Sequence, residues 1–164
     1  MTDLKNRAFD NGDVGIKLKN YEIFIAAMVG ARRTISGFTR DKSGQQDPNW
    51  GWHSDIEGAA GEMAVAKALN IYYDGSVGTF KAPDVGEFQV RHSERPEGSL
   101  IVRENDSSSE IFILVTGKAP NYVVRGYILG LDAKKERFIR NPNGKTPAWF
   151  VPQNSLQPIR DLKK

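Results

Sequence analysis

The segment Glu110–Thr116 constrains the fold more than any other part of this 164-residue sequence. It reads Glu-Ile-Phe-Ile-Leu-Val-Thr, a continuous apolar run between polar and glycine residues. A short apolar run that does not alternate with polar residues is typical of a β-strand buried on both faces. The run therefore predicts a strand inside a sheet that is covered on both sides.

Four further segments have strand patterns. Glu87–Arg91 alternates strictly between polar and apolar residues, which predicts a half-buried strand. Trp149–Val151 precedes a proline, and we expect it to be a short edge strand. The other two segments are Ser99–Arg103 and Tyr122–Leu131.

The first expected helix spans Asn20–Ile35. Arg32 and Arg33 lie in its last turn, where cations suit the helix dipole, and Gly37 follows as a stop signal. Apolar residues recur along this segment at helical spacing. They are Tyr21, Phe24, Met28, Ala31 and Ile35.

The second expected helix has the clearest start signal. Ser54 and Glu57 have the spacing of a capping box, so we predict that Ser54 is the N-cap and that Glu57 reaches back to it. The helix is expected to end near Leu69. It contains several glycines and alanines, whose small size allows close packing against a sheet or another helix.

Two helices followed by several strands indicate an α+β fold rather than a doubly wound one. The length favours a single domain over residues 1–164, with residues 1–18 flexible or peripheral. Thr39–Gly51 is predicted to be a mobile polar loop. Trp50 and Trp52 are expected to pin the far end of this loop to the core.

Composition excludes several classes of function. Cysteine is absent and only His53 and His92 carry imidazole, which excludes thiol nucleophiles, disulfides and Cys- or His-rich metal clusters. Neither a GxxxxGK[ST] motif nor a GxSxG motif is present, so we expect no nucleotide cofactor and no serine hydrolase chemistry. No transmembrane run or signal-peptide core is found, and with the lack of cysteine this predicts a cytoplasmic protein without membrane association.

Glu62 is the first carboxylate that is out of place. Its side of the predicted helix also carries Gly58, Ala59, Val65 and Leu69, which form a small apolar face suited to packing inward. An ionised carboxylate on such a face is costly unless it is paired or bound to a metal. Two interpretations remain open, a metal ligand or a tertiary salt bridge, for which Arg91 is a candidate partner.

Asp84 is the second such carboxylate. It follows Pro83 and directly precedes the strand predicted at residues 87–91, so it is either a turn residue or part of a site. Within that strand, Glu87, Gln89 and Arg91 share one face because strand side chains alternate. This polar row is either the wall of a site or a solvent-exposed face.

These residues resemble the PD-(D/E)XK nuclease superfamily. In that family a helix carrying Glu precedes a Pro-Asp pair, and an acidic-x-Lys triplet follows on the same or the next strand. The region that resembles the family spans residues 52–156, and its sequence is also similar to uncharacterised phage-encoded members. The matching pieces are Gly61-Glu62, Pro83-Asp84 and Gln89-Val90-Arg91.

The resemblance implies a restriction-endonuclease-like fold, with a central mixed β-sheet flanked by helices and a nuclease-like core at residues 52–156. It implies Mg²⁺- or Mn²⁺-dependent hydrolysis of DNA in a host cell cytoplasm. Glu62 and Asp84 would be metal ligands. Gln89 would stand at the position of the second acidic ligand, and Arg91 at that of the lysine, which completes the catalytic set.

Two residues depart from the family pattern. Gln89 carries no negative charge, and Arg91 stays protonated and cannot act as a general base. Glu87 is the candidate replacement for the missing metal-binding carboxylate, and Lys81 or Lys118 for the missing lysine. His92, which follows Arg91, is interpreted as a polar residue at the end of a strand.

The chain has a net charge of +3, which fits an anionic partner such as DNA. Three functional hypotheses stay open, namely an active nuclease, a catalytically degenerate DNA-binding protein of the same fold, and a protein-binding phage accessory factor. The sequence does not fix the oligomeric state. The candidate nucleic-acid-binding residues are Arg32, Arg33, Arg95, Arg103 and Arg125.

Overall fold

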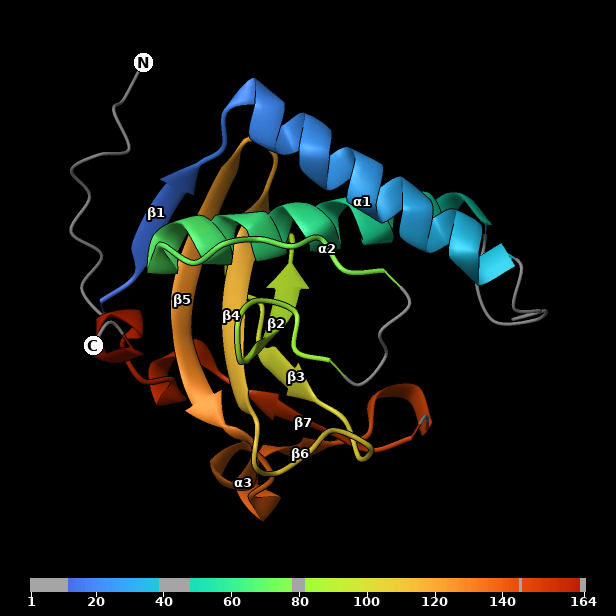
Figure 1. Ribbon diagram of the computed structural model, residues 1–164. Helices are drawn as coiled ribbons and strands as arrows, with labels where there is room; N and C mark the ends of the chain where they lie inside the picture. Colours follow the sequence, from blue (N-terminus) through green and yellow to red (C-terminus); the bar gives the residue numbers. More distant parts are fainter. Residues whose placement is uncertain (1–11, 39–47, 78–81, 145, 163–164) are drawn as a thin grey trace.

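The computed structural model describes residues 12–38, 48–77, 82–144 and 146–162, which form a mixed α+β fold (Figure 1). The main elements are β1 (Val14–Lys17), α1 (Asn20–Phe38), α2 (Pro48–Leu69), β2 (Phe88–Ser93), β3 (Leu100–Val102), β4 (Ile111–Lys118), β5 (Asn121–Leu129), α3 (Gly130–Ala133), β6 (Ile139–Arg140) and β7 (Ala148–Val151). Short 3₁₀ turns cover Glu136–Phe138, Pro142–Gly144, Gln153–Ser155 and Ile159–Leu162.

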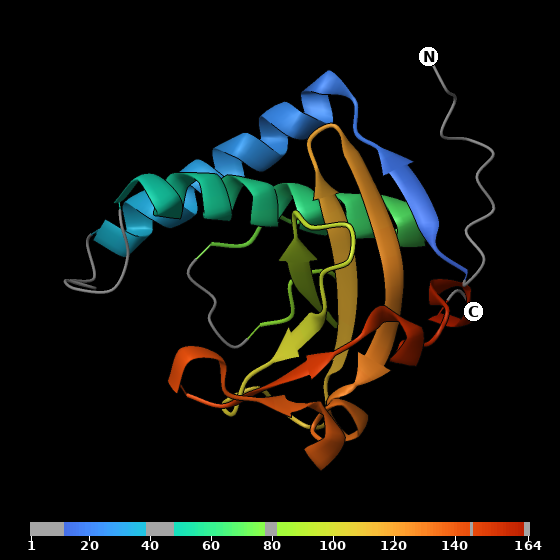
Figure 2. The same cartoon turned by 180° about the vertical axis from the view of Figure 1, so that it is seen from behind.

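The larger sheet has four strands in the order β1-β5-β4-β2. β5 pairs antiparallel with both β1 and β4, whereas β2 runs parallel to β4. The expected mixed sheet is therefore confirmed. A second, three-stranded antiparallel sheet in the order β3-β7-β6 lies at the end of the molecule opposite α1 (Figures 1 and 2).

β4 is the strand that was predicted to be buried on both faces, and this is confirmed. Ile113 and Val115 belong to the core that also contains the alanines of α2. Phe112 and Leu114 belong to a second core, which includes residues of β3 and β7. All four side chains are fully buried. The alternation of the strand thus divides the interior into two cores.

The helices are stacked on the larger sheet. α2 packs against the sheet and α1 packs against α2 (Figure 1). A Cβ atom on Gly61 would lie 3.0 Å from the Val115 Cγ1 atom, so α2 lies close to the sheet. A Cβ atom on Gly30 would lie 2.4 Å from the Cα atom of Ile56, so the two helices touch backbone to backbone there. Larger side chains at these two positions would push the layers apart.

The first predicted helix is confirmed, but it is oriented in an unexpected way. It continues through Gly37 to Phe38, so the predicted stop was wrong. Its buried side consists of Glu22, Ala26, Gly30 and Thr34, which are spaced four residues apart. The apolar residues that indicated the helix point outward instead, because the small residues allow the closer contact with α2. Tyr21, Phe24, Met28 and Ile35 are all exposed.

The predicted start of the second helix was wrong. α2 begins at Pro48, so Ser54 lies inside it and residues 48–51 are helical rather than part of a loop. Proline is well suited to the first turn of a helix. Glu57 accepts hydrogen bonds from the Tyr122 hydroxyl (2.7 Å) and the Ala119 N–H (3.4 Å), which tie α2 to the β4–β5 hairpin. The remainder of the predicted loop, residues 39–47, lies outside the described residues.

Phe38 and Trp52 meet edge to face, with ring centroids 6.1 Å apart. Trp52 therefore joins α2 to the end of α1, although it stays partly exposed. The side chain of Trp50 lies outside the described residues.

Two strand predictions need correction. Residues 14–18 are not peripheral, because β1 pairs with β5 and Leu18 is buried. This strand also precedes both helices, so helices and strands are not fully segregated along the chain. β7 is not an edge strand, since it lies between β3 and β6.

The helix crossing at Gly30 gives a stability prediction. We expect Gly30→Ala to lower the free energy of unfolding by about 1–3 kcal/mol, because the added methyl group has no room against Ile56. Gly37→Ala in the same helix is the matched control. No described atom lies within 4 Å of its Cβ position, so we expect it to stabilise the protein by about 0.5–1 kcal/mol. Urea unfolding of both variants checks this, and equal effects would contradict the close crossing.

Candidate functional site

Glu62 is buried at the interface between α1 and α2, where it is paired with Arg33. The Nη1 and Nη2 atoms of Arg33 donate to the Oε1 and Oε2 atoms of Glu62 at 2.7 and 2.8 Å. The hydroxyl of Tyr73 also donates to Glu62 Oε2, at 3.0 Å. The structure therefore shows a tertiary salt bridge, and its partner is Arg33 rather than Arg91.

Arg33 is held from two sides. Besides Glu62, its Nε and Nη2 atoms donate to the carbonyl oxygen of Ser76, at 3.3 and 3.0 Å. Burial by itself lowers the pKa of Arg33, but the hydrogen bonds and charge of Glu62 outweigh this effect and raise it. Burial and the nearby Glu62 charge together raise the pKa of Tyr73. At neutral pH, Glu62 thus faces a fixed cation and a neutral phenol donor.

Asp84 lies directly before β2 in a tight turn. The N–H groups of Asp84 and Val85 donate to the carbonyl of Phe88, and the N–H of Val90 donates to Asp84 Oδ2 at 2.7 Å. Burial and then the charge of Glu62 raise the pKa of Asp84 to about 6, although Val90, Arg91 and Arg33 oppose the shift. Ionisation of Asp84 is therefore less favourable in the folded protein than in the unfolded chain.

The charge of Glu62, on α2, raises the pKa of Asp84, in the turn before β2, so the two carboxylates interact electrostatically. Among the described residues, none donates a hydrogen bond to Asp84 Oδ1. In the described ranges, no group of three or more His, Asp or Glu side chains is arranged to hold a metal ion. The candidate site therefore consists of two carboxylates with Arg33 and Tyr73 beside them.

Gln89 and Arg91 point to the other side of β2. Their neighbour Val90 packs in the core beneath α2, whereas the guanidinium of Arg91 lies over the Phe112 ring in the second core, 5.0 Å from its centroid. Arg91 Nη2 donates to Asp106 at 2.9 Å and its Nε donates to the Ile101 carbonyl at 3.1 Å. The charge of Arg91 is still felt at Asp84, but its hydrogen bonds are made elsewhere.

The side-chain amide of Gln89 donates to Glu110 Oε1 at 3.2 Å. Glu87 is exposed and forms no hydrogen bond or ion pair with a described residue. His92 contacts the carbonyl of Gly117 through Nε2 at 2.7 Å and packs edge to face on Tyr122. Lys118 is exposed at the end of β4, and Lys81 lies outside the described residues.

The five candidate DNA-binding arginines fall into two groups. Arg32, Arg95 and Arg103 are exposed. Arg33 is bound to Glu62, and Arg125 donates to Asp13 (2.9 Å), Thr116 (2.8 Å) and the carbonyl of Pro96 (3.2 Å). The guanidinium groups of Arg33 and Arg125 are therefore occupied within the fold.

Sequence reasoning missed the structural role of Arg33 and Tyr73. The sequence did contain one signal for Arg33. Ala26, Gly30 and Thr34 are small residues spaced four apart, which indicates a helix-packing face. Arg33 lies at the border of this face. Tyr73 lies in an irregular segment after α2, where no periodicity reports its orientation.

Comparison of the chain with protein families, with characterised proteins and with solved structures finds no match. None of the described helices is both long and apolar enough to cross a membrane.

The Arg33–Glu62 pair gives a second prediction. Arg33→Met leaves Glu62 buried without its cation, and we expect a loss of about 2–4 kcal/mol in the free energy of unfolding. Arg32→Met, at the exposed neighbouring position, is the control and should change it by less than about 0.5 kcal/mol. The double variant Arg33→Met/Glu62→Gln should recover part of the loss. If both single variants unfold at the same urea concentration, the pair does not stabilise the helix interface.

Asp84 gives a prediction about pH. Its folded-state pKa of about 6 exceeds the ordinary value of 3.8, so the folded protein holds a proton that the unfolded chain releases. The wild type should therefore lose stability as pH rises from about 4 to about 6. Asp84→Asn keeps an acceptor for the Val90 N–H but removes the charge, so its stability relative to wild type should increase over that range. Urea midpoints at several pH values test this, and a constant difference would contradict it.

Proposed function

We propose that this protein binds DNA and hydrolyses its phosphodiester bonds with the help of Mg²⁺ or Mn²⁺ at Glu62 and Asp84. The observation that carries the proposal is the electrostatic interaction between these two carboxylates, one on α2 and the other in the turn before β2. The resemblance to the PD-(D/E)XK superfamily supports it, because these are the two positions that match the acidic residues of the family.

The donor set fits a hard cation in part. Mg²⁺ and Mn²⁺ prefer oxygen ligands, and Asp84 Oδ1 has no described partner. A nearby cation would also remove the unfavourable effect of ionising Asp84 beside Glu62. Glu62 would have to share its oxygens with Arg33, which already contacts both of them. Glu87 would be an additional ligand only if the exposed turn carrying it bends toward the site.

Within this proposal the residues of the chain have distinct roles. Asp84 would bind the cation, which when present supplies an activated water and stabilises the leaving oxygen. Arg33 would fix the carboxylate of Glu62 through its two parallel hydrogen bonds. Tyr73, as a neutral donor at neutral pH, would hold Glu62 Oε2 in place. Arg91 would contribute its positive charge near Asp84 without contacting it directly.

A second candidate function is DNA binding without cleavage. It is favoured by the engagement of Gln89 with Glu110 and of Arg91 with Asp106, on the side of β2 away from Glu62. The third and fourth catalytic positions of the family would then serve the fold rather than the reaction. Arg32, Arg95 and Arg103 would provide phosphate contacts in either case.

The proposal is tested by incubating single- and double-stranded DNA with purified wild type and Asp84→Asn in Mn²⁺ and in Mg²⁺. We expect metal-dependent cleavage by the wild type. The cleavage rate of the variant should be lower by about 100-fold or more, which is the usual effect of removing one strong electrostatic contribution. Glu136→Gln is the matched control, since it removes an exposed carboxylate in the 3₁₀ turn before β6 and should leave the rate unchanged.

Cleavage that survives in Asp84→Asn would contradict a metal site at this residue. Absence of cleavage by the folded wild type, together with DNA binding that weakens as salt rises, would instead support the non-catalytic candidate. Absence of DNA binding even at low salt would exclude both.

A further inference from the structure

α1 carries an apolar seam on the face opposite its buried side, and the last residue of the seam, Phe38, also contacts Trp52 of α2. The seam consists of Tyr21, Phe24, Met28, Ala31, Ile35 and Phe38. Its spacing alternates between three and four residues, which is the a/d pattern of helices that pack together in coiled coils. Among its large members, Phe24 is 66% exposed, Met28 53% and Phe38 60%. In a monomer this seam would therefore remain in water.

The seam is large enough to support an interface. A large aromatic side chain covers roughly 150–250 Å², so the exposed parts of six large apolar residues on α1 and of Trp52 amount to several hundred Å². The largest apolar patch of a typical monomer is about 300–600 Å², and a standard interface covers about 800 Å² on each partner. The exposed apolar area of this face is thus at the upper limit for a monomer. It approaches the area that one partner contributes to a stable dimer interface.

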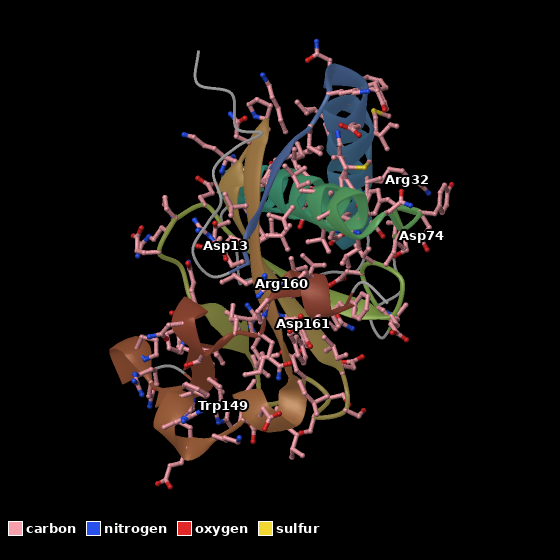
Figure 3. The ribbon with its side chains drawn as sticks, turned by 90° about the vertical axis from the view of Figure 1, so that its left-hand side faces the viewer. Asp13, Arg32, Asp74, Trp149, Arg160 and Asp161 are labelled. Carbon is pink, nitrogen blue, oxygen red and sulfur yellow. The ribbon has the colours of Figure 1, made fainter. Side chains whose placement is uncertain are left out.

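The charges on α1 favour an apolar partner. Its one acidic residue, Glu22, is buried and receives hydrogen bonds from the Lys19 N–H (2.6 Å) and the Lys67 ammonium (2.7 Å). Arg32 is the one charged residue among the exposed residues of the described helix, and it points away from the sheet (Figure 3). A membrane surface or a nucleic acid backbone would be matched by several cations on this face.

The seam is complementary to itself when two copies run antiparallel. In that orientation each residue at an a position, such as Met28, packs beside a residue at a d position of the other helix, such as Ala31. The two-fold axis passes midway between Met28 and Ala31. The large Met28 then lies against the small Ala31 of the other copy. Tyr21 lies against Phe38, and Phe24 against Ile35.

The antiparallel orientation also separates the cations. Arg32 of one copy comes to lie beside Ile25 of the other, so its aliphatic part covers apolar surface and its charge remains in water.

We propose that the occupant of this face is a second copy of the same chain, and that the protein forms a symmetric dimer through antiparallel α1 helices. The two α1 helices lie against each other at the centre of the dimer. The α2 helix and the four-stranded sheet of each copy lie on either side of them. The same surface patch serves both subunits, as a two-fold axis requires. The interface is separate from Glu62 and Asp84, so the dimer can exist whether or not the protein cleaves DNA.

The dimer is tested first by sedimentation or light scattering of the full chain over micromolar concentrations. We expect a mass twice that of one chain for the wild type. We expect Met28→Glu to raise the dissociation constant at least about 100-fold, since it places a charge at the centre of the seam. Leu131→Glu is the matched control, because Leu131 is 64% exposed on α3, and it should leave the dimer intact. Circular dichroism and thermal unfolding should show Met28→Glu folded, because Met28 is exposed in each chain.

The orientation is tested by cross-linking, which the absence of cysteine makes clean. Phe24→Cys combined with Ile35→Cys should give covalent dimers on mild oxidation. Within one helix these positions are about 16 Å apart, too far for a disulfide inside one chain. Phe24→Cys alone should give few cross-links.

Efficient cross-linking of the single variant would overturn the antiparallel orientation. A wild type that stays monomeric at all concentrations would overturn the dimer. So would binding of the monomer to anionic vesicles that Met28→Glu abolishes, which would assign the face to a lipid surface.

Discussion

The close crossing of α1 and α2 at Gly30 is the constraint on which the candidate site depends. The short separation brings α1 against α2 where both guanidinium Nη atoms of Arg33 donate to the carboxylate of Glu62. Thr34, one turn beyond Gly30, donates to Asp55 Oδ2 at 2.7 Å across the same interface. The crossing thus supplies a buried carboxylate, which would be costly alone, with an arginine partner that holds it in place.

The two carboxylates of the site differ in how well the fold compensates their charge. Arg33 and Tyr73 satisfy Glu62, whereas burial and the charge of Glu62 raise the pKa of Asp84 to about 6. Groups held in an unfavourable ionisation state are common at functional sites, where a ligand supplies what the fold lacks. The same crossing also leaves the large apolar residues of α1 exposed. The geometry of the site and the exposure of the proposed dimer seam therefore depend on the same helix contact.

Much of the fold could be predicted from local sequence pattern, while much of the site could not. The central strand β4 and the presence of a helix beginning at Asn20 followed from runs and periodicity that local residues determine. The strand β1 was missed because four residues with no strong alternation give little signal before they pair with β5. The start of α2 was misplaced because a capping-box spacing occurred inside a helix that begins earlier. Glu62 and Asp84 were found as carboxylates in unusual contexts, but Gln89 and Arg91 could not be separated from them by spacing alone.

The sequence by itself determined that this chain has a sheet with a doubly buried strand, two helices rich in small residues, and a carboxylate on the inward face of the second. These properties depend on which residues neighbour each other along the chain. Only the tertiary structure decided which face of α1 is buried, which cation pairs with Glu62, and on which side of β2 Arg91 lies. Each of these depends on contacts between residues far apart in sequence. Steric fit determines which face of α1 is buried, since Gly30 and its small neighbours allow a closer approach to α2 than the larger apolar residues on the other face.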